Sequence, residues 1–269
     1  MKTTYDNKEV RIATGGKDHD GVDGPAVVLL HGAGMDRTTW QMQSRWLSHH
    51  GYRVAAIDLP GHGLSEGPPL ETISEMAAWT AGVVRQLDLA PAHIVGFSMG
   101  TFIGLDMAAE YPDTVASLVL IGTASAMPVH PVLLDASRDD VPRASRLMTS
   151  WGIGSKAHRG GHQSPGTWLI GTSTALLDTS PEGALLADMV ACNAYGDGVE
   201  HAREIDAPVT FLLGKEDKMT PIKASHDLVD AVKNKQVITL DSIGHMMPIE
   251  DPIGARKAID GGIRWALEH

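Results

Sequence analysis

Short, strongly apolar runs recur along this chain and alternate with stretches whose apolar residues repeat at helical spacing. Most of the runs are apolar at every position, which is typical of strands that are covered on both faces. Six runs are predicted strands, at residues 26–32, 52–61, 93–100, 115–123, 208–214 and 236–245. Five stretches are predicted helices, at residues 40–49, 73–87, 101–111, 222–232 and 253–266. The alternation predicts a doubly wound α/β fold with a mostly parallel sheet between helices, and we expect an antiparallel edge hairpin within Tyr5–Thr14.

The segment 124–206 interrupts this alternation between two predicted core strands. It is far longer than the usual connection in an α/β unit, which has about 2–6 residues. We therefore expect residues 1–123 and 207–266 to form the core and residues 124–206 to form an inserted helical cap. The last three residues, Leu267, Glu268 and His269, resemble the start of an expression-tag linker, so His269 is set aside as a functional candidate.

Charge and composition narrow the range of partners. The formal net charge of −11 argues against nucleic acid or an anionic membrane as the main partner, because both are polyanions. No apolar run approaches the roughly 20 residues that span a bilayer, and the first residues lack the apolar core of a signal peptide. The single cysteine, Cys192, excludes an intramolecular disulfide and fits a cytoplasmic protein. We expect this thiol to be buried, inert and far from the motifs described next, and the chain to be a monomer or a homodimer.

The pentapeptide "GFSMG", residues 96–100, places Ser98 between a predicted strand and a predicted helix. In that position G-x-S-x-G predicts a sharp turn that lifts the serine hydroxyl above the edge of the sheet. Glycines at positions 96 and 100 allow the backbone to pack closely around such a turn. The alternative is a serine that only caps the following helix.

A nucleophilic serine needs a histidine base and a carboxylate that orients the base. Asp217 follows the predicted strand ending in "LLG", with Glu216 beside it, and His245 follows the last predicted strand. Because the carboxyl ends of parallel strands share one edge of the sheet, we expect Ser98, Asp217 and His245 to converge there.

Four blocks in the same order resemble the α/β-hydrolase fold superfamily, in particular its serine esterase, lipase and haloperoxidase-like members with a helical cap. They are "HGAG" (31–34), "DLPGHGLS" (58–65), "GFSMG" and the pair "GKEDKMTP" with "GHMMPIEDP". The resemblance implies Ser98 as nucleophile, His245 as general base and acid, and Asp217 rather than Glu216 as the orienting acid. It also implies that the backbone amides of Ala33 and Met99 form the oxyanion hole. The acid site that some relatives use after the preceding strand is excluded, because "LVLIGTASAMP" contains no Asp or Glu.

The remaining histidines are predicted to have other roles. We expect His31 to brace the oxyanion loop, His62 to be structural, and four more to be solvated: His49, His50, His201 and His226. His158 and His162 lack companions at metal-ligand spacing, so we predict no metal site and expect these two to reach the substrate pocket if they act at all. No phosphate-binding loop is present, and no cofactor is expected.

The predicted function is that of a serine hydrolase that cleaves small to medium carboxylic esters through an acyl-enzyme. The resemblance leaves a lactonase (including one for acyl-homoserine lactones), a cofactor-free haloperoxidase or perhydrolase, and a C–C bond hydrolase open, since all use the same triad. A non-catalytic relative that binds a ligand or a partner is the alternative from another class. For the predicted hydrolase, the expected partner is a small-molecule ester or lactone substrate.

Overall fold

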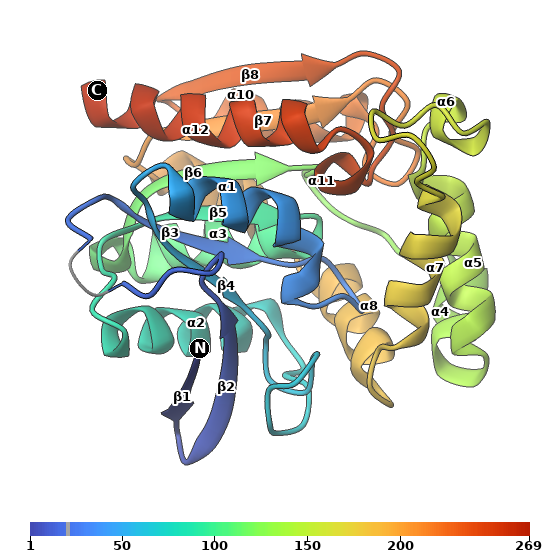
Figure 1. Cartoon of the computed structure of the whole chain (residues 1–269), viewed down its shortest axis with the longest axis horizontal. Coiled ribbons are helices and arrows are strands. Elements are labelled where there is room, and N and C mark those ends of the chain that lie inside the picture. Colours follow the sequence, from blue (N-terminus) through green and yellow to red (C-terminus); the bar gives the residue numbers. More distant parts are fainter. Residues whose placement is uncertain (20–21) are drawn as a thin grey trace.

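The structure is a computed structural model that describes residues 1–19 and 22–269. Within this part of the chain, eight strands form one sheet in the order β1-β2-β4-β3-β5-β6-β7-β8, as Figure 1 shows. The strands are β1 (Lys2–Tyr5), β2 (Lys8–Ala13), β3 (Ala26–Leu30), β4 (Arg53–Ile57), β5 (Ala92–Phe97), β6 (Val115–Ile121), β7 (Val209–Gly214) and β8 (Lys235–Leu240). The six predicted core strands are confirmed as β3 to β8, and all of their pairings are parallel.

The expected edge hairpin is also present, but its first strand begins at Lys2, ahead of the predicted range Tyr5–Thr14. Strand β1 pairs antiparallel with β2, and β2 pairs antiparallel with β4. Strands β3, β5 and β7 are buried at every position, as their continuously apolar sequences predict. The sheet is therefore covered on both faces, and the fold class is the doubly wound α/β arrangement that the sequence predicts.

Helices of the core cover the sheet. They are α1 (Gln41–His49), α2 (Ile73–Gln86), α3 (Met99–Glu110), α10 (His226–Ala231), α11 (Met247–Glu250) and α12 (Pro252–Glu268), with 3-10 turns η1 (Arg37–Trp40), η2 (Pro112–Thr114) and η3 (Ile222–Ser225). Helix α1 packs against α12 and α2 packs against α3, and Figure 1 shows α1 and α12 in front of the sheet. Helix α12 includes Leu267 and Glu268, two of the three residues that resemble the start of an expression-tag linker. That these residues come from a tag stays a prediction.

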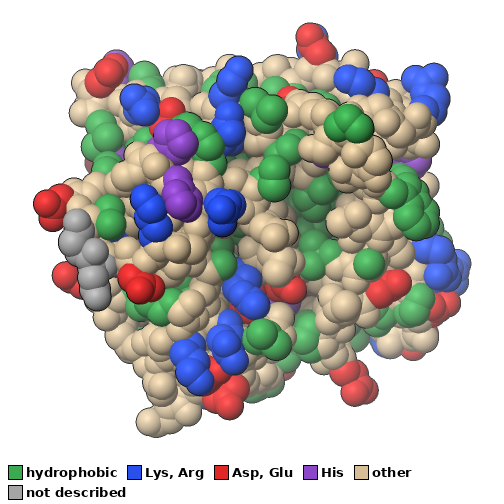
Figure 2. Space-filling model, viewed as in Figure 1, with side chains coloured by type: hydrophobic (Ala, Val, Ile, Leu, Met, Phe, Trp, Pro, Cys, Tyr) green, Lys and Arg blue, Asp and Glu red, His purple; other side chains and the backbone are tan. Residues whose placement is uncertain are grey.

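The long insertion between β6 and β7, called the cap below, is helical. It contains α4 (Pro131–Asp139), α5 (Val141–Gly152), α6 (Ser155–His158), α7 (Leu169–Asp178), α8 (Ala184–Ala194) and α9 (Gly198–Glu204). In Figure 1, α4, α5 and α7 lie beyond the carboxyl ends of the strands, with α8 between them and the core. Figure 2 shows the surface hollowed between core and cap, with hydrophobic side chains inside the hollow.

Candidate active site

Ser98 lies at the turn between β5 and α3. Its backbone has φ 52° and ψ −117°, a conformation with positive φ that is strained for a residue with a side chain. A Cβ on Gly96 would come within 2.2 Å of the Gly100 carbonyl oxygen, and one on Gly100 within 2.5 Å of the Leu30 oxygen. Both glycines are therefore required for the close packing of the turn. Ser98 occupies the N-cap position of α3, but its side chain makes no capping hydrogen bond, so helix capping does not explain this serine.

His245 and Asp217 meet at the same edge of the sheet. His245 Nδ1 lies 2.8 Å from Asp217 Oδ2, and both side chains are almost completely buried. The Nε2 atom of His245 is buried and has no hydrogen-bond partner among the described residues. Two residues that are 28 positions apart are thus paired, with one imidazole nitrogen left available.

The Asp217 carboxylate accepts several hydrogen bonds from its own loop. Oδ1 accepts from the amides of Met219 and Thr220 at 2.9 and 2.8 Å, and Oδ2 accepts from the Thr220 hydroxyl at 2.8 Å. Burial by itself favours the protonated acid, but His245 and these hydrogen bonds outweigh it and lower the pKa of Asp217. The carboxylate is held charged and fixed in position against Nδ1 of His245.

Glu216, the neighbouring acid, points elsewhere. Its Oε2 accepts a hydrogen bond from the Ser155 amide at 2.6 Å, at the start of α6 in the cap. This bond lowers the pKa of Glu216, whose side chain is half-buried. Asp217, and not Glu216, contacts His245.

A second buried carboxylate, Glu250, organises the loop that carries His245. Glu250 Oε2 accepts from the Gly244 amide at 3.2 Å and from the cap's Gly154 amide at 2.8 Å, and Oε1 accepts from Met246 at 3.1 Å. The His245 amide also donates to the Gly152 carbonyl of the cap at 2.6 Å. The histidine loop is therefore bonded directly to the cap.

The two predicted oxyanion amides lie beside Ser98. Met99 is the first residue of α3, so its N–H has no acceptor within the helix. A Cβ on Gly32 would come within 3.2 Å of Ser98 Cβ, which places the loop of Ala33 directly against the serine. Throughout residues 1–19 and 22–269, Ala33 donates no hydrogen bond from its amide. Ala33 and Ser98 line the same pocket.

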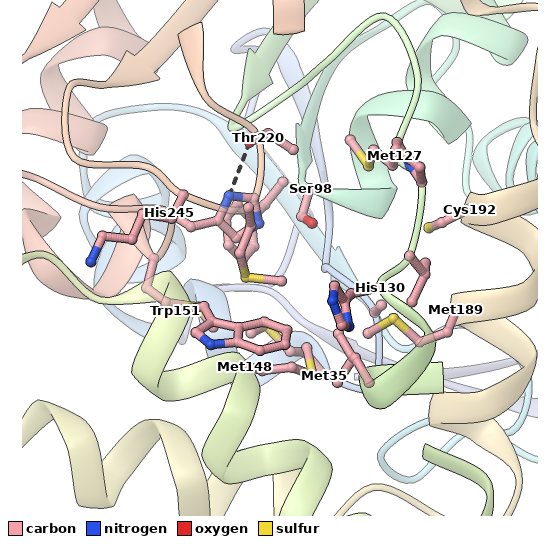
Figure 3. A pocket seen from close by; sticks show the side chains of 18 residues that line it. Met35, Ser98, Met127, His130, Met148, Trp151, Met189, Cys192, Thr220 and His245 are labelled. Atoms are coloured by element: carbon pink, nitrogen blue, oxygen red, sulfur yellow. Dashed lines mark hydrogen bonds between the residues drawn. The ribbon is translucent and has the colours of Figure 1, made fainter. Parts of the chain in front are cut away.

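This pocket has a volume of about 150 Å³ and lies between the core and the cap. Figure 3 shows the Ser98 hydroxyl pointing into it, with Trp151, Met148 and Met35 on the opposite side. Its walls are mainly apolar and rich in methionine: Met35, Met127, Met148, Met189, Met219 and Met246. Polar groups other than the residues around Ser98 are His130 and Lys218. The wall chemistry favours an apolar group of the substrate, and flexible methionines fit groups of irregular shape.

The structure corrects two predictions about cap residues. Cys192 is buried, as expected, but it lines the pocket with Ser98 instead of lying far from it. His158 and His162 do not reach this pocket; their Nε2 atoms contact the Ile153 and Ile249 carbonyls at 3.1 Å each. His130 and Trp151, whose rings meet at 5.8 Å between centroids, line the pocket instead. No pattern in the sequence singles out these two residues, because the cap helices, and not a motif, place them.

The roles predicted for the structural histidines fit their contacts. Nδ1 of His31 donates to the Gly32 carbonyl at 3.0 Å, and its Nε2 accepts from the Leu59 amide at 3.3 Å. His31 therefore braces the loop that precedes Ala33.

His49, His50 and His226 are exposed as predicted, whereas His201 is mostly buried and its Nδ1 lies 3.0 Å from the Tyr195 hydroxyl. Within the described residues, no group of three or more His, Cys, Asp or Glu side chains could hold a metal ion.

Comparison with known proteins places this geometry in a family. Residues 25–164 match the model of the alpha/beta hydrolase fold family, and the chain belongs to that family. Over 221 residues it is 34% identical to the pimeloyl-(acyl-carrier protein) methyl ester esterase of Methylococcus capsulatus, covering 74% of this chain and 79% of that protein. Solved structures with the same fold include the enol-lactonase of Burkholderia xenovorans, with a TM-score of 0.84, 20% identity and coverage of 98% and 100% of the two chains. A thermophilic esterase from Thermogutta terrifontis has a TM-score of 0.82 at 23% identity, covering 99% and 98%.

The family match and the similarity to the Methylococcus capsulatus esterase support hydrolase activity for this chain, and the two solved structures show the shared fold. Among the described helices, none is both long enough and apolar enough to cross a membrane.

Proposed function

We propose that this protein is a serine hydrolase that cleaves carboxylic esters of small to medium size through an acyl-enzyme. The observation that carries the proposal is the Asp217–His245 pair, 2.8 Å apart. Among the residues that the structure describes, Nε2 of His245 has no hydrogen-bond partner, and His245 lines the same pocket as Ser98. Neither Ser98 nor His245 needs a cofactor or a metal for this chemistry.

In the acylation step, Nε2 of His245 takes the proton of the Ser98 hydroxyl as Oγ bonds to the ester carbonyl carbon. The carbonyl oxygen becomes an oxyanion that accepts hydrogen bonds from the amides of Ala33 and Met99. Each such donor lowers the barrier by about 3–4 kcal/mol. The C–O bond to the alcohol then breaks, and His245 returns the proton to the departing alkoxide.

In the deacylation step, His245 removes a proton from water as the water oxygen bonds to the acyl carbon. The tetrahedral intermediate collapses, the carboxylic acid leaves, and Ser98 regains its proton from His245. Asp217 stabilises the imidazolium that forms in both steps, because its carboxylate is already desolvated and held by Thr220.

The pocket supports an ester whose group near Ser98 is compact and apolar. Its volume of about 150 Å³ equals that of an engineered apolar cavity that binds benzene. Lys218 and His130 are the groups at the pocket that would meet a more polar part of the substrate.

Labelling with a fluorophosphonate probe tests the proposal, because the probe reacts only with an activated serine. We expect the wild-type protein to be labelled once, and Ser98→Ala to lose the label and nearly all hydrolysis of p-nitrophenyl acetate while remaining folded. Ser150→Ala, an exposed serine on α5, is the matched control and should keep both. Absence of labelling in the folded wild-type protein would favour the non-catalytic binding protein instead. A panel of esters of graded acyl length, lactones and dienoic acids then separates the ester hydrolase from the enzymes that use the same triad.

A further inference from the structure

A buried carboxylate of the cap contacts the loop of the oxyanion hole, an arrangement whose meaning rests on the function proposed above. Asp188 lies on α8 and is completely buried. Its Oδ2 atom accepts a hydrogen bond from the Gly34 amide at 2.8 Å and another from Nε2 of His62 at 2.9 Å. One oxygen of the cap thus joins two segments of the core, 31–34 and 58–65, that are separate in sequence.

The contacts of His62 define its protonation state. Nδ1 lies 2.9 Å from the Pro60 carbonyl oxygen, which can only accept a hydrogen bond, and Nε2 faces the Asp188 carboxylate. With Asp188 as the carboxylate, both ring nitrogens carry a proton and the ring is an imidazolium. Burial disfavours this charge, but Asp188 and the Pro60 carbonyl raise the pKa of His62 above its ordinary value.

The neighbouring ring of His31 is in the opposite state. It donates from Nδ1 to Gly32 and accepts from Leu59 at Nε2, so it is neutral. Burial lowers the pKa of His31, and the positive charge of His62, whose ring centroid is 5.0 Å away, lowers it further. The two rings of the blocks "HGAG" and "DLPGHGLS" therefore carry one charge between them, and Asp188 neutralises it.

Helix α8 also packs directly on the oxyanion loop. Gly34 has φ +68°, and a Cβ at this position would come within 2.6 Å of a methyl carbon of Leu185, one turn before Asp188. Because Gly34 follows Ala33, the bond to Asp188 fixes the Ala33–Gly34 peptide unit. That peptide adjoins the one whose N–H is the proposed oxyanion donor.

We propose that Asp188 is a positioning residue for the oxyanion hole: paired with the His62 imidazolium, it holds the Gly34 amide and so orients the Ala33 amide toward the pocket. The cap of this protein thus completes the catalytic site in addition to enclosing the substrate. Without Asp188, the Gly34 amide has no acceptor and the His62 charge has no partner, and the loop loses its fixed geometry.

Steady-state kinetics of Asp188→Asn and His62→Asn test the catalytic consequence. Each substitution should misplace the Ala33 amide, which is needed as a donor only in the transition state. We therefore expect kcat to fall by about tenfold or more and KM to change by less than about threefold. The rate of fluorophosphonate labelling should fall in proportion to kcat. The kcat of the double variant should be at most about twofold lower than that of either single variant, because both substitutions break the same Asp188–His62 pair. Asp178→Asn, an exposed carboxylate on α7, is the matched control and should behave like the wild type. An unchanged kcat, a change in KM alone, or additive losses would overturn the proposal.

Two measurements do not depend on turnover, so they separate this link from the proposed hydrolase activity. In the wild-type protein, the ¹⁵N signals of His62 should show two protonated ring nitrogens near neutral pH, and the Gly34 amide should exchange slowly with solvent. In Asp188→Asn, exchange at Gly34 should become at least about tenfold faster. A neutral His62 ring in the wild type, or Gly34 exchange that is unchanged in the variant, would refute the link even if Ser98 proves to be catalytic. Conversely, an unreactive Ser98 with both signatures present would leave the link intact and refute the hydrolase.

Discussion

Two buried histidine–aspartate pairs occur in this protein, and their geometry is nearly the same. His245 and Asp217 are 2.8 Å apart at the ends of β8 and β7, and His62 and Asp188 are 2.9 Å apart between the core and the cap. All four side chains are at most 2% exposed. The difference lies in the second nitrogen of each ring. Nε2 of His245 has no hydrogen-bond partner in the part of the chain that the structure describes, whereas Nδ1 of His62 is bonded to the Pro60 carbonyl.

That difference decides what each pair can do. A ring that exchanges protons with a substrate needs one nitrogen that is bonded to a carboxylate and one that is available. His245 meets both conditions, and it lines the same pocket as Ser98. His62 has both nitrogens occupied and is held as a cation, so it can bind a partner element but cannot shuttle a proton. A buried His–Asp pair therefore indicates catalysis only where the second nitrogen is open.

The largest expected effect comes from Asp217→Asn. The amide keeps the size of the side chain but removes the charge that stabilises the His245 imidazolium, so kcat for p-nitrophenyl acetate should fall by about 10³- to 10⁴-fold. Glu216→Gln makes the same change one residue away, where the side chain contacts Ser155 and not His245. It should change kcat by less than about threefold. Equal losses in the two variants would contradict the pairing of Asp217 with His245.

The next effect concerns stability and has opposite pH dependence in the two pairs. The pKa of His62 is raised, so its pair stabilises the fold fully below the unfolded value of about 6.5 and loses this contribution as pH rises through the raised pKa. The pKa of Asp217 is lowered, so its contribution is present above about pH 3.9 and is lost as pH falls through the lowered pKa. Asp58 and His31, the other charged or titratable groups that act on His62, are unchanged in the variants below.

Urea unfolding checks this sign. Breaking a buried ion pair by removing one partner costs about 3–5 kcal/mol, so Asp188→Ala should be that much less stable than the wild type at about pH 6. This difference in the free energy of unfolding should narrow by at least about 1 kcal/mol when the two proteins are compared at a pH of about 9, where His62 loses its charge. Asp188→Asn, which keeps the side-chain volume, provides a second measurement if the alanine variant does not fold. A stability difference that does not narrow as pH rises would contradict a charged His62 in the folded protein.

The sequence predicts the core in detail because each of its signals is local. Continuous apolar runs identify the six parallel strands, and the glycines around Ser98 indicate a turn that only closely packed backbone can make. The predicted residues Ser98, Asp217 and His245 all follow strands of one parallel sheet, and topology alone brings such positions to one edge. Their assigned roles in catalysis remain predictions that the variants above test, as do the cytoplasmic location and the monomeric or dimeric state.

The cap could be recognised only as an insertion. Asp188 lies in an apolar helix, "ALLADMVACNA", and nothing in that sequence shows that it faces His62 across 126 positions. His130, Trp151 and Cys192 reach the pocket through helix packing that no short motif specifies. Glu250 is equally hidden, since one of its amide partners, Gly154, lies 96 positions away in the cap. Contacts between single buried polar groups that are far apart in the sequence therefore cannot be predicted from local sequence patterns.

The smallest expected effect concerns Cys192, whose thiol lines the pocket together with Ser98. Cys192 lies one helical turn after Asp188, and burial together with the Asp188 charge raises the pKa of its thiol far above the ordinary value. A thiol that stays protonated is a poor nucleophile, so folded wild-type protein should resist iodoacetamide, whereas the urea-unfolded chain should be alkylated once. Cys192→Ala should change kcat by less than about twofold, with at most a modest rise in KM from the lost packing. Rapid inactivation of the folded enzyme by iodoacetamide would show instead that the Cys192 thiol is activated in the pocket. The charge of Asp188 would then not keep this thiol protonated as it keeps His62 protonated.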